Sequence, residues 1–179
     1  LSALVHSHLI ELGENIRHGN TNTYKLFWNT SRYGRPDEPK VEDDCRDALL
    51  ELLRGRLKPL DIDAQPEGYY ADDKRADIRV SFAGTGGFNV PIEIKREMHP
   101  DLWSAMHSQL IKKYTRDPGA NGNGIYLVFW YGGEKATTPP KGVDKPASAK
   151  ELQDQLVAML SSEERRLIRV CVVDVSKSE

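Results

Sequence analysis

The chain has 179 residues, of which 39% are hydrophobic and 29% charged, and its formal net charge is −2. The near-neutral charge neither supports nor excludes nucleic-acid binding, which would need a local basic patch. No apolar run approaches the ~20 residues that cross a bilayer, and no signal-peptide pattern is present, so we expect a cytoplasmic protein without membrane contact.

The first third of the chain predicts two helices joined by a long polar connection. Residues 1–17 carry a loose apolar stripe that is typical of a helix, whereas residues 18–40 are rich in turn-forming residues. Residues 41–57 form the strongest helical pattern, and Glu42 lies in its first turn, where the helix dipole favours negative charge. The aromatic residues that we expect to hold the connection on the core are Tyr24, Phe27 and Trp28.

The middle of the chain predicts a hairpin followed by a helix. Residues 75–82 (RADIRVSF) and 88–95 (FNVPIEIK) alternate as two strands, and residues 61–73 before them are a strand-like piece or a loop. Pro91 has no backbone donor, which indicates a local edge or a bulge. A helix is expected to begin at Pro100 and continue to residue 117. The turn of the hairpin contains Gly84, Gly86 and Gly87.

The last third predicts two buried strands and one helix. Residues 124–131 (GIYLVFWY) are a continuous apolar run, as in a central strand covered on both faces. A flexible loop follows over 132–147, then a helix over 148–166 with a break near Ser161, and a final strand over 167–175. This order predicts an α/β fold with a mixed sheet flanked by helices.

We expect one domain over residues 1–179, with an N-terminal helix and loop at 1–40 and the core at 41–175. Because the chain begins with Leu1, we expect it to be a fragment of a longer protein. Cys45 and Cys171 lie far apart without metal-ligand spacing, so two buried free thiols are expected.

Three charged residues stand among isoleucine and valine in the paired strands, where charges are costly. Side chains at i and i+2 share a face, so Glu93 and Lys95 lie together, and antiparallel pairing brings Asp77 close to them. Two neighbouring carboxylates repel unless a cation lies between them, and magnesium suits such a pair because it uses few carboxylates and keeps several waters. A nearby ammonium can orient or deprotonate a water, or stabilise developing negative charge. The pattern therefore predicts metal-assisted phosphodiester hydrolysis.

The series Asp77, then Glu93-Ile94-Lys95, resembles the PD-(D/E)xK nuclease superfamily, which has the restriction-endonuclease-like fold. The resemblance spans roughly residues 41–131. It implies that Asp77, Glu93 and the carbonyl of Ile94 bind magnesium or manganese and that Lys95 is the catalytic lysine.

The sequence departs from the family motif at Ala76 and agrees with a further family feature at Glu42. Ala76 stands where the family motif is named for proline. In the family, a helix before the motif often supplies a further glutamate, which implies that Glu42 binds the metal directly or through water.

The helix after the motif extends the resemblance, because some branches of the family carry Gln and Tyr there, four positions apart. Here Gln109 and Tyr114 are five apart, which does not place both on one α-helical face, so Lys113 is an alternative for the second role. Gln109 is retained as a catalytic-site residue. The basic cluster of Lys112, Lys113 and Arg116 is expected to contact nucleic-acid phosphates.

The resemblance implies a magnesium-dependent endodeoxyribonuclease, with DNA as the partner and RNA not excluded. It also implies a role in restriction, repair or phage defence. A homodimer and an upstream ATPase or sensor domain are compatible with this resemblance. Two alternatives stay open: a catalytically silent nucleic-acid-binding or assembly module on the same fold, and an unrelated α/β domain with a fortuitous charge cluster. The loops at 18–40 and 132–147 are the expected specificity elements.

Overall fold

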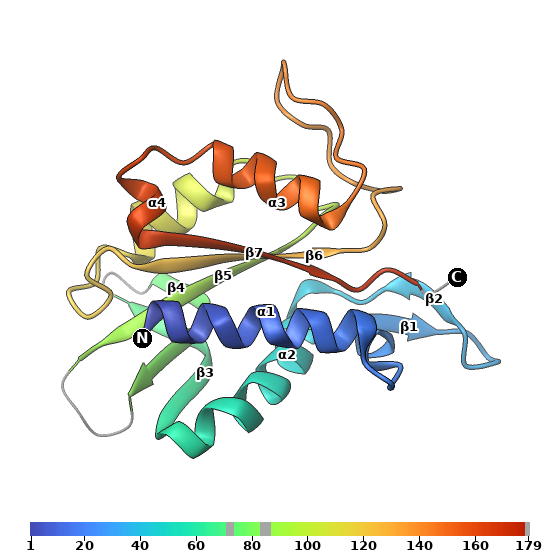
Figure 1. The fold of residues 1–179 in the computed structure, drawn as a ribbon, viewed down its shortest axis with the longest axis horizontal. Helices are drawn as coiled ribbons and strands as arrows, with labels where there is room; N and C mark the ends of the chain where they lie inside the picture. The colour runs from blue at the N-terminus through green and yellow to red at the C-terminus, as the bar shows by residue number, and fades with distance from the viewer. Residues whose placement is uncertain (71–73, 83–86, 178–179) are drawn as a thin grey trace.

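The structure, a computed structural model, describes residues 1–70, 74–82 and 87–177. These residues form a five-stranded sheet with the order β3-β4-β5-β6-β7 and a separate two-stranded ribbon of β1 and β2 (Figure 1). The strands of the sheet are β3 (Ile62–Tyr70), β4 (Lys74–Phe82), β5 (Asn89–Arg96), β6 (Gly124–Trp130) and β7 (Ile168–Asp174). The neighbours β3, β4 and β5 are antiparallel, whereas β5, β6 and β7 are parallel. The predicted mixed sheet in an α/β fold is confirmed.

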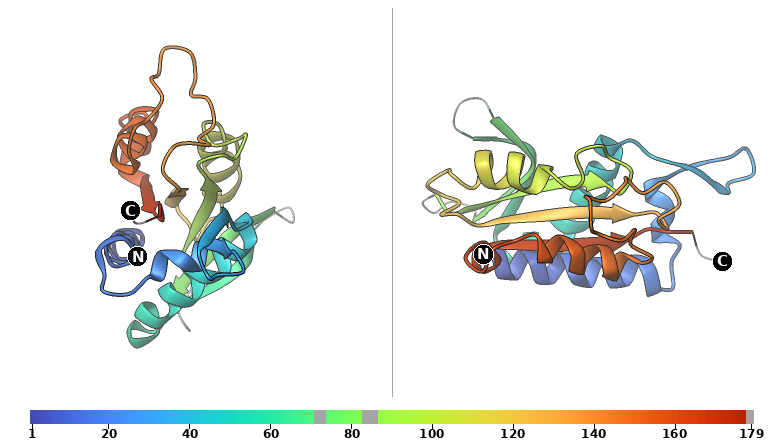
Figure 2. Two further views of the ribbon diagram at one scale, coloured as in Figure 1. Left: turned by 90° about the vertical axis from the view of Figure 1, so that its right-hand side faces the viewer. Right: turned by 90° about the horizontal axis from the view of Figure 1, so that it is seen from above.

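Helices cover both faces of the sheet and give three layers (Figure 2). One face packs against α1 (Ser2–His18) and α2 (Glu42–Leu57), and the other against η4 (Met106–Tyr114) and α3 (Ala149–Ala158). The interior strand β6, between β5 and β7, is buried at every position, as its continuous apolar sequence predicts. No helix among the described residues is long and apolar enough to cross a membrane.

The N-terminal connection contains more structure than its polar sequence indicates. A short 3-10 helix, η1 (Thr23–Phe27), is followed by the ribbon strands β1 (Trp28–Thr30) and β2 (Pro36–Pro39). Phe27 and Trp28 are buried, as predicted, and the ring of Phe27 lies 4.9 Å from that of Phe129 on β6. These aromatic side chains fix the base of the ribbon on the sheet.

Truncation of Phe27 should show how much this anchor contributes. We expect Phe27→Ala to lower the free energy of unfolding by about 3–5 kcal/mol, because it removes a fully buried ring and leaves a cavity. Urea unfolding followed by circular dichroism measures the change. Tyr33→Ala, at an exposed position of the same connection, is the control that should leave stability unchanged. Equal stability of the two variants would contradict the anchoring role.

The structure distinguishes the alternatives that the sequence left open for the segment before the hairpin and for Pro91. Within the segment 61–73, residues 62–70 form the strand β3, which pairs antiparallel with β4, and residues 71–73 lie outside the described residues. Pro91 pairs with Arg79 without a register shift, and β6 joins β5 only from Ile92 onward, so Pro91 lies at a local edge and not in a bulge. Gly87 has a positive φ of 82°, which suits a turn glycine, whereas Gly84 and Gly86 lie outside the described residues.

The helix expected from Pro100 to residue 117 is wrong in both extent and type. Asp101–Ser104 form a turn, and the regular helix η4 begins at Met106. This helix is a π-helix, and its end is closed by the N–H of Thr115 donating to the carbonyl of Leu110, five residues back, at 3.1 Å. The wider turn changes which side chains share a face.

The C-terminal helix is broken near Ser161, as predicted. The chain leaves α3 at Ala158 and re-enters a short helix, α4 (Glu164–Leu167). Ser161 Oγ accepts the N–H of Glu164 at 3.2 Å, and a carboxylate oxygen of Glu164 accepts the N–H of Ser161 at 2.8 Å. This reciprocal pair starts a new helix and so explains the break.

Both cysteines are buried free thiols, as expected. Cys171 lies on β7, and burial raises the pKa of its thiol to about 12. Cys45 lies on α2, 3.1 Å from the hydroxyl of Tyr131. Neither thiol is activated as a nucleophile by its surroundings.

Candidate active site

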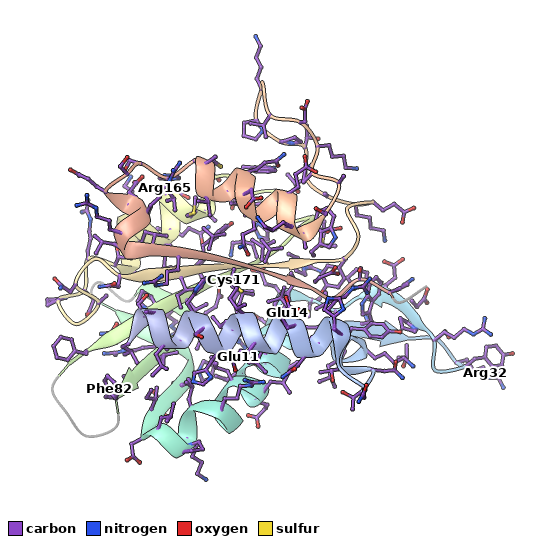
Figure 3. The ribbon with its side chains drawn as sticks, in the orientation of Figure 1. Glu11, Glu14, Arg32, Phe82, Arg165 and Cys171 are labelled. Atoms are coloured by element: carbon purple, nitrogen blue, oxygen red, sulfur yellow. The ribbon has the colours of Figure 1, made fainter. Side chains whose placement is uncertain are left out.

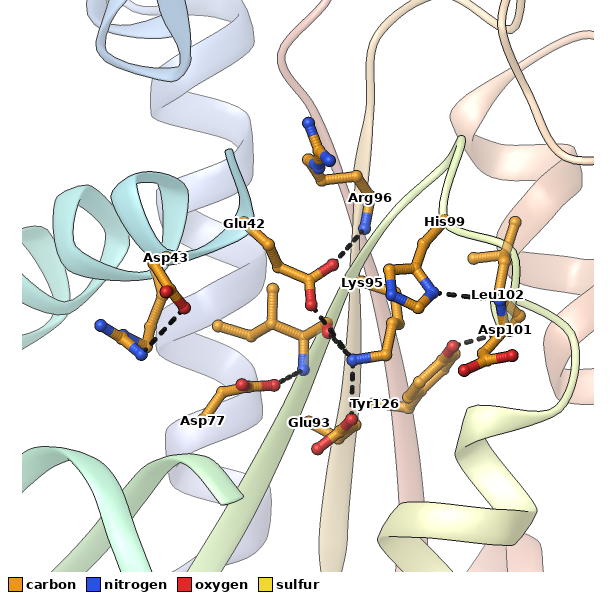
Figure 4. A network of polar contacts seen from close by, with 12 residues as sticks. Glu42, Asp43, Asp77, Glu93, Lys95, Arg96, His99, Asp101, Leu102 and Tyr126 are labelled. Carbon is orange, nitrogen blue, oxygen red and sulfur yellow. Dashed lines mark hydrogen bonds and ion pairs between the residues drawn. The ribbon is translucent and has the colours of Figure 1, made fainter. Parts of the chain in front are cut away.

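A cluster of charged side chains lies where β4 and β5 separate, beside the first turn of α2 (Figure 4). The described ladder between the two strands ends at the pair Ile78 and Ile92. One residue further along β4, Asp77 Oδ2 accepts the N–H of Ile94 at 2.6 Å. At the point where β4 and β5 separate, the carboxylate of Asp77 therefore accepts a backbone N–H that a carbonyl would accept in a continuous ladder. This hydrogen bond holds Asp77 beside Glu93, Ile94 and Lys95.

Lys95 is the centre of this cluster. Its Nζ donates to the carbonyl of Ile94 at 2.7 Å and lies 2.8 Å from Glu93 Oε1 and 3.2 Å from Glu42 Oε1. The side chains of Lys95 and Glu93 are only 5% and 2% exposed. A buried ion pair of this kind contributes little to stability, since desolvation offsets the attraction, so its presence favours a functional role.

Glu42 joins α2 to β5 through both carboxylate oxygens. Oε1 contacts Lys95, and Oε2 accepts the N–H of Arg96 at 3.2 Å. The side chain of Glu42 is 22% exposed, so one part of the cluster remains open to solvent. The helical pattern places Glu42 in a first turn and the family resemblance implies a place at the metal site; the structure brings it into contact with Lys95.

The carboxyl groups of the cluster have raised pKa values chiefly because they are buried. Burial, followed by the charge of Asp77, raises the pKa of Glu93 to about 8, against the attraction of Lys95. Burial also raises the pKa of Asp77, although Lys95 and the hydrogen bond from Ile94 oppose the rise. Burial disfavours the charged form of Lys95, but Glu93, Asp77 and Glu42 outweigh it, and the pKa of the ammonium is raised.

This donor set fits a hard divalent cation. The carboxylates of Asp77 and Glu93 and the carbonyl of Ile94 are oxygen donors, and a divalent ion would favour the ionised form of both carboxyl groups, whose pKa values are raised chiefly by burial. Within the described ranges, no three His, Cys, Asp or Glu side chains are grouped closely enough to hold a metal ion by themselves. Because the donors named here are all oxygens, magnesium or manganese fit better than zinc, which favours nitrogen and sulfur ligands.

The π-helix η4 corrects the expectation for Gln109 and Tyr114. In a π-helix, hydrogen bonds join residues five apart, so a spacing of five places two side chains one turn apart on one face. Tyr114 is buried, and burial together with the charges of Glu93 and Asp77 raises the pKa of its phenol to about 12. Tyr114 is thus buried and feels the charge of the carboxylates, whereas Lys113 is exposed.

The remaining predicted residues lie nearer to solvent. Gln109 is partly buried on η4, one turn before Tyr114. The basic residues expected to contact phosphates are all exposed: Lys112, Lys113 and Arg116. They stand on or just after the helix that carries Tyr114, where a bound polyanion can reach them.

Sequence reasoning missed Arg46 and Tyr126. Arg46 lies one helical turn after Glu42, bonds Asp43 at 3.2 Å and Asp47 at 2.9 Å, and its charge opposes the rise in the pKa of Asp77. The i, i+4 spacing from Glu42 was the available signal. Tyr126 lies beside Glu93 in the β5–β6 register and donates its hydroxyl to the carbonyl of Leu102 at 2.6 Å.

The fold and the site define a mixed α/β domain with a buried lysine surrounded by carboxylates. Residues 2–133 match the model of a family described as a domain of unknown function, DUF8371, and the chain belongs to this family. The matched range includes α1 through β6 and hence every residue of the cluster. No curated protein and no solved structure matches the chain.

Proposed function

We propose that this chain is a metal-dependent nuclease domain with the restriction-endonuclease-like fold, and that it hydrolyses DNA phosphodiester bonds. The observation that carries the proposal is the convergence of Asp77, Glu93 and Lys95 at one point, on adjacent strands. Glu42 joins them from the preceding helix. This is the arrangement that the resemblance to PD-(D/E)xK nucleases implies.

The chemistry follows from the donor set. Asp77, Glu93 and the carbonyl of Ile94 would hold magnesium or manganese, with Glu42 binding directly or through water. When bound, the ion supplies Lewis-acid polarisation of the phosphate and a lowered pKa for a bound water. Lys95 keeps its proton because its pKa is raised, so it acts as a fixed cation that orients water and stabilises charge developing on the phosphate.

A cleavage assay with several nucleic acids tests this proposal and identifies the substrate of the domain. The domain is incubated with magnesium, manganese or chelator and with supercoiled plasmid, linear duplex, single-stranded DNA and RNA. We expect metal-dependent cleavage of DNA. A silent binding module would shift DNA in a gel without cutting it, and cleavage confined to RNA would replace the substrate assigned here.

Metal binding should depend on pH in a direction set by Glu93. Its carboxyl group has a pKa raised to about 8, and the ion binds only the ionised form, so protons compete with metal below that pH. The dissociation constant for Mn²⁺ should therefore fall by up to roughly tenfold per unit between about pH 6 and pH 8 and level off above. Calorimetric titration under argon measures it, and a constant affinity over this range would contradict the role of Glu93.

A further inference from the structure

The β1–β2 ribbon projects from the body of the domain as an arm (Figures 1 and 2). Its tip is a tight turn in which the N–H of Gly34 donates to the carbonyl of Ser31 at 2.9 Å, and Gly34 has a positive φ of 72°. The N–H of Ser31 donates to the carbonyl of Arg35 at 2.8 Å. The turn is thus closed by backbone hydrogen bonds and presents its side chains outward.

The side chains at this tip do not stabilise the fold. Tyr33 is 85% exposed, the largest exposure among the exposed large hydrophobic residues of the described chain. Arg32 and Arg35 flank it, both are exposed, and Figure 3 labels Arg32 at the outer end of the arm. An exposed aromatic ring between two arginines is typical of a binding surface, because each side chain combines a planar face with a polar end.

The charge along the arm is uneven in a way that favours an anionic partner. Near the base, Glu38 is paired with Lys135 at 2.7 Å, so its negative charge is compensated within the domain. At the tip, neither Arg32 nor Arg35 forms an ion pair with any residue that the structure describes. Asp37 on β2 is an exposed acid that is likewise in no ion pair with a described residue, but the two arginines outnumber it. The uncompensated charge of the arm is therefore positive on balance, with its positive part at the outer end.

The base of the arm is joined directly to the candidate active site. Lys40 is the first residue after β2, and its backbone carbonyl accepts a hydrogen bond from the guanidinium of Arg96 at 2.9 Å. Glu42 follows two residues later. From Tyr33 to Glu42, the chain spans at most about 30 Å at ~3.3 Å per residue. One turn of B-DNA measures about 34 Å. A duplex held at the site would thus meet the tip within one helical turn.

We propose that the β1–β2 arm enters the major groove of duplex DNA beside the active site, with Arg32, Tyr33 and Arg35 as its contacts. The inference rests on the proposed nuclease function and identifies the β1–β2 arm as an element that binds the substrate. A two-stranded ribbon fits the major groove, which is about 12 Å wide, and arginine there bonds guanine edges or nearby phosphates. A ribbon needs a groove, which favours duplex DNA over a single strand.

The test measures DNA binding without cleavage. Binding of a fluorescent duplex of about 30 base pairs is followed by anisotropy in chelator, at several salt concentrations. The double variant Arg32→Ala/Arg35→Ala should bind about tenfold more weakly and lower the salt slope by about 2, because two phosphate-directed cations are lost. Tyr33→Ala should weaken binding about fivefold, through loss of apolar contact with base edges in the groove, with an unchanged slope because the ring is uncharged.

Arg166→Ala is the matched control, because it removes an exposed arginine from α4, at the opposite end of the domain (Figure 1). Arm variants that bind like this control would overturn the inference, and so would a wild-type domain that binds no duplex. Weakened binding of RNA alone would assign the arm to RNA instead. If the wild-type domain binds duplex DNA but never cleaves it, and the arm variants lose this binding, the role of the arm in binding is supported. Only the proposed nuclease activity is then refuted.

Discussion

Glu93→Gln is expected to abolish both Mn²⁺ binding and DNA cleavage, with the rate falling by about a thousandfold or more. Glutamine keeps the size of the side chain but removes the negative charge that a divalent ion needs. The domain should remain folded, because the change also removes the repulsion from Asp77 that contributes to the raised pKa of Glu93. Lys95 keeps two acceptors, Glu42 and the carbonyl of Ile94.

Glu97 offers a matched control for this change, since it is an equally buried carboxylate just beyond the end of the same strand. It accepts the N–H groups of Tyr131 at 2.8 Å and Gly133 at 3.1 Å, which is a structural role. Glu97→Gln should lower stability by roughly 1–3 kcal/mol, yet retain metal binding. Cleavage that survives in Glu93→Gln, or metal binding that is lost equally in both variants, would contradict the assignment.

Lys95→Met should separate metal binding from catalysis. Methionine fills a similar volume without charge, so we expect the cleavage rate to fall about a hundredfold to a thousandfold, as when one transition-state donor is removed. Binding of Mn²⁺ should be retained, because Glu93 and the carbonyl of Ile94 lose the ammonium that now contacts them. A purely structural ion pair would show the reverse, with reduced stability and no effect on the turnover of folded protein.

Calorimetry with Mn²⁺ and single-turnover cleavage measure the two effects of Lys95→Met. The control is Lys150→Met, which breaks the exposed pair of Lys150 and Asp154 on α3 and removes the same charge. It should change neither quantity, because exposed ion pairs contribute little. Lost metal binding in Lys95→Met would mean that the lysine holds the site together and does not act on the substrate.

The sequence is informative about this fold where side-chain periodicity is strong. Alternation along residues 75–82 and 88–95 predicts the hairpin, and the apolar run at 124–131 predicts a central strand. Charges within such strands identify Asp77 and the Glu93–Lys95 pair as candidates, because burial of charge needs a reason.

The features that sequence reasoning missed depend on tertiary structure or on rare geometry. β3 contains acids, Pro and Gly, so its composition favours a loop until β4 pairs with it. The π-turn of η4 has no simple sequence signal, which made the spacing of Gln109 and Tyr114 look unfavourable. The resemblance implies Glu42 at the site, but its contact with Lys95 joins residues 53 positions apart, and the helical pattern alone does not predict it without the packing of α2 on the sheet.

The most direct test of the central claim is the conversion of supercoiled plasmid by the wild-type domain and by Glu93→Gln, purified in parallel. Each is assayed in magnesium, in manganese and in chelator, so that a contaminating nuclease would appear in both preparations. We predict nicked or linear DNA only with wild-type protein and metal. Intact plasmid with wild-type protein in both metals, or equal cleavage by Glu93→Gln, would contradict it.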